Sequence, residues 1–73
     1  MKWIKTIETE KPKDGERVVC LCKYRDRYSV AIFMYSHYFQ QWSDGFQYFD
    51  LDHVEAWTHM DNVAADYKEQ SDV

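Results

Sequence analysis

The residues with the clearest potential for chemistry are two cysteines and three histidines. Cys20 and Cys22 are one residue apart, and His37, His53 and His59 follow them. Zinc binds thiolate or imidazole ligands in a tetrahedron, so two thiols on one strand face would supply half of a site. Structural zinc sites more often place their cysteines in a turn, whereas this pair lies in a stretch rich in Val and Leu. Two small buried hydrophobic residues are therefore favoured. No cofactor is expected, and Cys20, Cys22 and His37 are the candidates for a metal site.

The sequence contains few of the residue arrangements that enzyme active sites require. A cysteine nucleophile needs a thiolate, a nearby base and an electropositive cleft, and no histidine lies near the thiols in the sequence. The carboxylates of Asp44, Asp50, Asp52 and Glu55 could form a hydrolytic pair or a cation loop, but the further oxygen ligands of a calcium loop are missing. We predict that the protein is not an enzyme. The alternative is a small metal-binding or hydrolytic enzyme that uses the two cysteines with histidines.

Aromatic residues are concentrated between Tyr35 and Phe49, and strand alternation in so small a domain cannot bury all of them. Exposed Tyr and Trp act as interface hot spots or as platforms for stacked bases. The stretch contains no Lys or Arg, which favours a protein partner over nucleic acid. An aromatic core with an exposed rim remains the structural alternative. The candidate binding residues are Tyr35, Tyr38, Phe39, Phe46, Tyr48, Asp44, Asp50 and Asp52.

The net charge of −4 conceals an asymmetry between the two parts of the chain. Residues 1–43 contain eight basic and five acidic residues, a net of +3, whereas residues 44–73 contain eight acidic residues and one lysine, a net of −7. This distribution favours a basic partner, such as a nucleic-acid-binding host protein, or a second copy of the chain. Direct nucleic-acid binding is disfavoured, because it normally requires a basic stripe.

The elements that must position these residues are mostly strands. A chain of 73 residues forms one domain and buries only about 60% of its unfolded surface, so oligomerisation is a realistic source of stability. We predict a mainly β fold with four to six antiparallel strands, in a small sheet or partly closed barrel. Residues 1–60 form the β-rich domain, and residues 61–73 form a short helix or a frayed acidic tail. Strands are predicted over residues 3–7, 17–23, 28–35, 39–42, 47–49 and 54–59.

The predicted core follows from the alternation of apolar residues in these strands. No run approaches the ~20 apolar residues of a membrane helix, and the first residues lack the apolar region of a signal peptide, so a cytoplasmic protein is expected. The predicted core residues are Ile4, Val18, Cys20, Val30, Ile32, Met34, Trp42 and Trp57.

Four short motifs, in their order along the chain, resemble those of a phage and prophage family known as domain of unknown function 551. Its members open with Trp-Ile, continue through a Pro-x-Asp/Glu-Gly turn into a Val-rich strand, and close near a last Trp. The matching segments here are Trp3-Ile4, residues 12–18, residues 39–42 and residues 54–57. The resemblance covers residue 3 to about residue 60. It implies a compact β-rich protein of a phage or integrated element in a bacterial host cell, and it implies no activity.

The chain departs from this family around its last tryptophan. Ala56 stands where the family has His, and Thr58-His59-Met60 replaces Met-Pro. Any binding role of the family's His-Trp pair is therefore in doubt for this chain.

Overall fold

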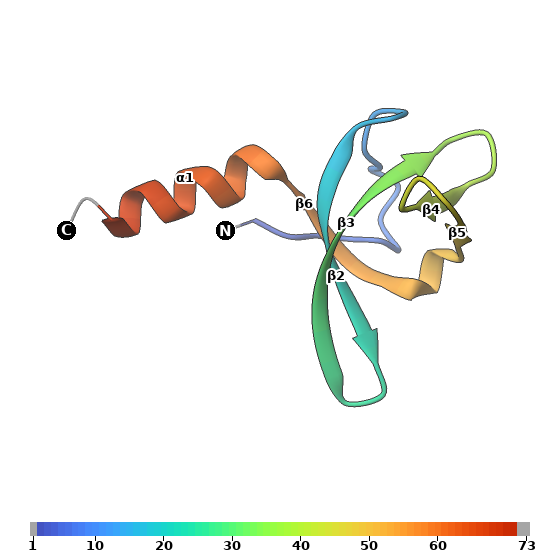
Figure 1. Cartoon of the computed structure of the whole chain (residues 1–73), viewed down its shortest axis with the longest axis horizontal. Coiled ribbons are helices and arrows are strands. Elements are labelled where there is room, and N and C mark those ends of the chain that lie inside the picture. The colour runs from blue at the N-terminus through green and yellow to red at the C-terminus, as the bar shows by residue number, and fades with distance from the viewer. Residues whose placement is uncertain (1, 72–73) are drawn as a thin grey trace.

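The computed structural model describes residues 2–71 and consists of one sheet and one helix (Figure 1). The strands are joined by short turns, and a 3-10 turn, η1, precedes the last strand. The elements are β1 (Ile4–Lys5), β2 (Arg17–Tyr24), β3 (Arg27–Ser36), β4 (Gln41–Ser43), β5 (Tyr48–Phe49), η1 (Leu51–His53), β6 (Val54–His59) and α1 (Met60–Ser71).

The six strands form one open antiparallel sheet in the order β1-β6-β2-β3-β4-β5. Strands β2 to β5 follow one another through tight connections, as expected for successive hairpins. The chain then returns through η1, so β6 pairs with both β2 and β1. The mainly β fold with a C-terminal helix is confirmed, and the predicted strand over residues 54–59 coincides with β6.

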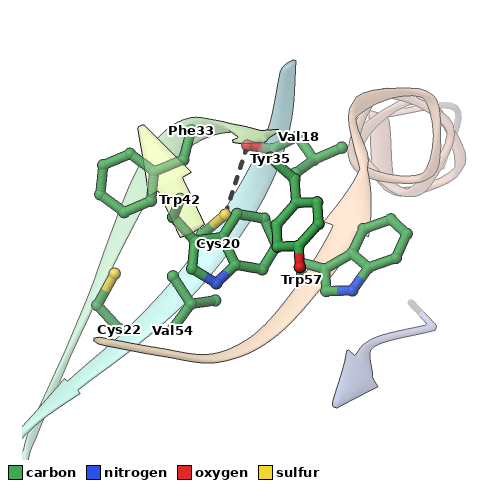
Figure 2. Packing of buried hydrophobic residues seen from close by; sticks show 8 residues of the cluster. All are labelled: Val18, Cys20, Cys22, Phe33, Tyr35, Trp42, Val54 and Trp57. Carbon is green, nitrogen blue, oxygen red and sulfur yellow. Dashed lines mark hydrogen bonds between the residues drawn. The ribbon is translucent and has the colours of Figure 1, made fainter. Parts of the chain in front are cut away.

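The sheet has an inner face that holds the core (Figure 2). Residues opposite each other on neighbouring strands share a face, so Cys20 aligns with Ala31 on one side and with Trp57 on the other. Trp42 and Trp57 are 0% exposed, and the Tyr35 ring meets the Trp42 ring at a centroid distance of 5.1 Å. The core cluster contains Val18, Cys20, Cys22, Phe33, Tyr35, Trp42, Val54 and Trp57, with Ile4, Ala31 and Phe49 packed against it.

The predicted core is wrong for β3. Val30 and Ile32 are 64% and 48% exposed and Met34 is only partly buried, whereas Phe33 and Tyr35 are buried. The register explains the difference, because Val18 lies opposite Phe33 and places the larger aromatic side chains on the inner face. Burying these rings removes more apolar area from water than burying the aliphatic residues would. The predictions for Val18, Cys20, Trp42 and Trp57 are confirmed.

The loop before β2 is attached to the turn between β3 and β4. The His37 ring Nε2 lies 2.6 Å from the carbonyl oxygen of Pro12, and the His37 backbone N–H donates to the Asp14 carboxylate at 3.1 Å. Gly15 has a φ of +80°, which the turn at this point requires. These contacts bury Pro12 and hold the predicted turn against the sheet.

Helix α1 leaves the sheet instead of covering it (Figure 1). Its first turn is fixed by Asn62, whose side-chain amide donates to the Thr58 hydroxyl at 3.1 Å. The radius of gyration of 12.8 Å exceeds the value of about 11 Å for a compact chain of this length. The helix continues to Ser71, and residues 72–73 of the predicted frayed tail lie outside the described residues.

The turn between β2 and β3 places Arg25 at a φ of 58°, which glycine adopts more easily. We expect Arg25→Gly to raise the free energy of unfolding by about 0.5–1 kcal/mol, because relief of this strain exceeds the entropy cost of glycine. Asp26 has no positive φ, so Asp26→Gly is the matched control and should lower stability. Urea unfolding of both variants measures the difference. Equal changes in the free energy of unfolding of the two variants would show that the backbone at Arg25 is unstrained.

Candidate functional site

Three exposed aromatic rings form a row at the sheet edge that carries β4 and β5. The rings of Tyr38 and Phe39 meet edge to face at 4.9 Å, and the rings of Phe39 and Tyr48 lie 5.0 Å apart. The three residues are 87%, 54% and 52% exposed, respectively. Ring pairs at these distances are favourable beyond their buried area, so the row is a preformed apolar surface in contact with solvent.

Local backbone geometry positions this row. The turn between β3 and β4 is held by the Phe39 N–H, which donates to the Ser36 hydroxyl at 3.2 Å, and Gln40 adopts a φ of 53°. Phe39 therefore belongs to this turn and not to the predicted strand over residues 39–42. Tyr48 lies opposite Ser43 in the register of β4 and β5, which brings its ring toward Phe39.

Three carboxylates lie near the row and differ in their bonding. Asp44 accepts hydrogen bonds from the backbone N–H groups of Phe46 and Gln47 at 2.8 and 2.9 Å, and these bonds lower the pKa of Asp44. Asp50 accepts a bond from the Gln41 side-chain amide at 3.2 Å. Asp52 has no hydrogen bond or ion pair within the described part of the chain. Asp52 is therefore the carboxylate most available to a partner.

A hollow of about 410 Å³ joins part of this acidic group to the aromatic row. His53 lines it and stacks on Phe49 at a ring distance of 4.6 Å. Lys23 reaches the same hollow from β2, which sequence reasoning did not predict because only the sheet order brings β2 near η1. The lining residues are Lys23, Tyr48, Phe49, Asp50, Asp52 and His53.

The structure brings most of the predicted binding residues to one side of the molecule. Tyr48, Asp50 and Asp52 line one hollow, and Tyr38 and Phe39 continue from Tyr48. Phe46 is 97% exposed in the connection between β4 and β5, close in the chain to Asp44. Tyr35 is the exception, because it is buried between Trp42 and His37, with ring distances of 5.1 and 4.9 Å. Tyr35 therefore supports the surface from within the core and does not contribute to it.

The cysteines are placed for packing. Both are buried, and the Cys20 thiol donates to the Val18 carbonyl at 3.8 Å. Burial is the main reason that the pKa of Cys20 rises to about 12, and burial also raises the pKa of Cys22. His37 instead contacts Pro12, and within residues 2–71 no three His, Cys, Asp or Glu side chains are grouped to hold a metal ion. This geometry favours neutral core thiols over metal ligands or nucleophiles.

We expect both thiols of the native protein to resist a disulfide reagent at neutral pH. The rise in the pKa of Cys20 from 9.0 to about 12 lowers its thiolate fraction by about 1,000-fold, and burial also blocks access to both sulfurs. Unfolding in urea should release two rapidly reacting thiols, and the Cys20→Ala and Cys22→Ala variants identify each thiol. A native thiol that reacts as fast as in urea would support the reactive-cysteine alternative.

Asp44 and Asp52 should respond differently to substitution. Asp44→Ala removes the acceptor that organises the β4–β5 turn and should lower the urea midpoint, whereas Asp52→Ala should leave it unchanged. Because the folded pKa of Asp44 lies below its ordinary value of 3.8, its stabilisation is complete above that pH. The stabilisation is lost as the pH falls through the lower folded pKa. Urea titrations between neutral and acidic pH, with Asp44→Asn as control, measure this loss. Equal pH profiles for the wild type and the Asp44→Asn variant would contradict it.

Comparisons of the chain with protein-family models, with curated proteins and with solved structures find no match. The resemblance to domain of unknown function 551 therefore stays a prediction. None of the helices in the described residues has the length and apolar character needed to span a membrane.

Proposed function

We propose that this protein is a non-enzymatic protein-interaction module of a phage or integrated element. It binds a protein of the bacterial host or of the phage through the surface formed by Tyr38, Phe39, Phe46, Tyr48, Asp50 and Asp52, which we call the aromatic surface. The observation that carries this proposal is the row of exposed rings from Tyr38 to Tyr48, because mutually packed rings lose little conformational freedom when a partner covers them.

Charge around the aromatic surface supports a basic partner. No Lys or Arg occurs between Arg27 and Lys68, and Lys23 of β2 lines the hollow beside Asp50 and Asp52. The Asp52 carboxylate makes no bond with Lys23 or with any other group of the described residues. A Lys or Arg of the partner could approach this carboxylate while an apolar group covers the rings. Electrostatic attraction of this kind increases the association rate and weakens with added salt.

The partner class that fits this chemistry is a basic, nucleic-acid-binding host protein. The aromatic surface would occupy the groove in which that protein holds nucleic acid, because aromatic rings and carboxylates match a groove built for bases and phosphates. In this role the module acts as an inhibitor of the host protein, for example of one that serves in host defence.

A comparison of surface variants tests the proposed function. The protein is used to capture partners from a lysate of the bacterial host, in parallel with a Tyr38→Ala/Phe39→Ala variant. Ile7→Ala is the matched control, because Ile7 is an exposed apolar residue near the other edge of the sheet. We expect a basic protein that is retained by the wild type and the control, is lost with the double variant, and elutes with added salt.

The dissociation constants of the purified partner for the wild type and for the double variant then measure how much affinity the two rings contribute. Truncation of one hot-spot ring costs about 2 kcal/mol or more, so the double variant should weaken binding by at least about 30-fold. Far-UV circular dichroism verifies that the variant remains folded. A partner that binds the wild type and the double variant equally would contradict a role of the aromatic surface, and capture of no basic protein would contradict the proposed function.

A further inference from the structure

The face of the sheet opposite the core is apolar at its centre, and we call it the outer face. By register it carries Val19 and Leu21 of β2 beside Ile32 and Val30 of β3, which are aligned as direct cross-strand pairs. Val30 and Ile32 remain largely exposed, and Val19 and Leu21 are only partly covered. Four such aliphatic residues on adjacent strands form a continuous apolar patch of the kind that marks interaction sites.

The rim of the outer face is basic. Arg17 and Lys23 stand at the two ends of β2 on this face, and Lys5 of β1 lies on the same face opposite Ala56. Two acids lie at its margins, because Asp44 shares a hollow with Arg17 and Ile32, and Glu55 shares one with Lys5 and Ala56. The three basic residues exceed these two acids by one. Neither Arg17 nor Lys23 forms an ion pair within the described residues. The outer face therefore fits an occupant that is apolar along one side and acidic beside it.

Helix α1 has this chemistry. Met60, Ala64 and Tyr67 follow the i, i+4, i+7 spacing of one helix face, and all three are exposed. Lys68 and Asp61 border that face on one side, and Asp66 lies beyond Val63 on the other. Residues 60–69 contain three acids and one lysine, a net charge of −2, so the helix as a whole is acidic. The helix does not lie on its own sheet beyond the first turn, where Asn62 contacts Thr58 at the edge of the outer face.

We propose that the outer face binds helix α1 of a second copy of this chain, in a two-fold symmetric dimer. Each helix then covers the partner's sheet, and one interface occurs twice, as a two-fold axis requires. At both contacts, the basic residues of one protomer's sheet meet the other protomer's helix, which carries a net negative charge. The apolar patch and the helix face that each chain leaves exposed are covered by the same association.

Dimensions are compatible with this arrangement. The 12 residues of α1 extend over about 18 Å, and four neighbouring strands extend over roughly 19 Å. One helix can therefore cross β6, β2, β3 and β4 of the partner. The proposal does not depend on the proposed function, because Tyr38 and Phe39 lie in the turn beyond these strands. Lys23, which also lines the hollow of Asp52, and Tyr48, which lies on the outer face by register, border both surfaces.

Sedimentation velocity of the full chain between about 1 and 200 µM provides the first test. We expect a concentration-dependent shift from the monomer mass of 8.9 kDa to the dimer mass. A wild-type protein that remains monomeric throughout this range would overturn the proposal, and a helix from another protein would then be the better occupant of the outer face.

Charge-reversal variants of the sheet and of the helix test whether these two surfaces form the interface. The sheet variant is Arg17→Glu/Lys23→Glu, and the helix variant is Asp61→Lys/Asp66→Lys. In each variant alone, helix and sheet carry like charges, so the dissociation constant should rise on the order of 100-fold. In a 1:1 mixture both contacts of the mixed dimer pair opposite charges, and dimerisation should return. Lys11→Glu/Lys13→Glu and Glu8→Lys/Glu10→Lys make the same charge changes in the loop before β2 and should have no effect.

The mixture separates the proposed interface from the alternatives. Recovery of the dimer only in the mixture requires contact between one chain's helix and the other's sheet, and a variant that merely unfolds would not recover. Two results would overturn the proposal. One is a dimer unaffected by either variant, which would place the interface elsewhere, and the other is a pair of monomeric variants that stay monomeric when mixed.

Discussion

The structure depends on the burial of Trp42 and Trp57 against one face of a single sheet. Both indoles are completely buried, and they come from β4 and β6, which lie on opposite sides of the central β2–β3 hairpin. Burying these two rings requires β6 to return beside β2 and β4 to pair with β3. A chain of this size has enough large side chains to cover only one sheet face. The outer face is left without a second layer, and the proposed dimer would cover it.

The two proposed interactions are centred on different parts of the surface left by this core, and Lys23 and Tyr48 lie at the border between them. The aromatic surface lies at the β4–β5 edge, where short turns support Phe39 and Tyr48, whereas the outer face is centred on β2 and β3. In the proposed dimer, the turn that carries Tyr38 and Phe39 lies beyond the covered strands, so two copies of these rings remain exposed. A partner with two accessible sites would then be bound more tightly than by one surface alone, provided that the geometry permits simultaneous contact.

The strand pattern could be predicted from the sequence because it depends on local alternation and turn chemistry. The segment that forms β6 and the turn at Gly15 are examples, since each is specified by neighbouring residues. The inner face of β3 could not be predicted, because both of its faces are apolar and only the register with β2 decides between them. The prediction of Tyr35 as a surface residue is wrong for the same reason. Lys23 joins the hollow of Asp52 only through the sheet order.

By itself, the sequence determined the β-rich class, the approximate positions of the strands, the exposed aromatic residues between Tyr38 and Tyr48, and the unequal distribution of charge. These properties follow from composition and from the order of residues along the chain. Tertiary structure alone decided which apolar residues enter the core and which acids have bonding partners. It also decided that helix α1 projects from the sheet. The physical reason is that burial, hydrogen bonding and charge pairing depend on contacts between residues that are distant in the sequence, such as His37 with Pro12.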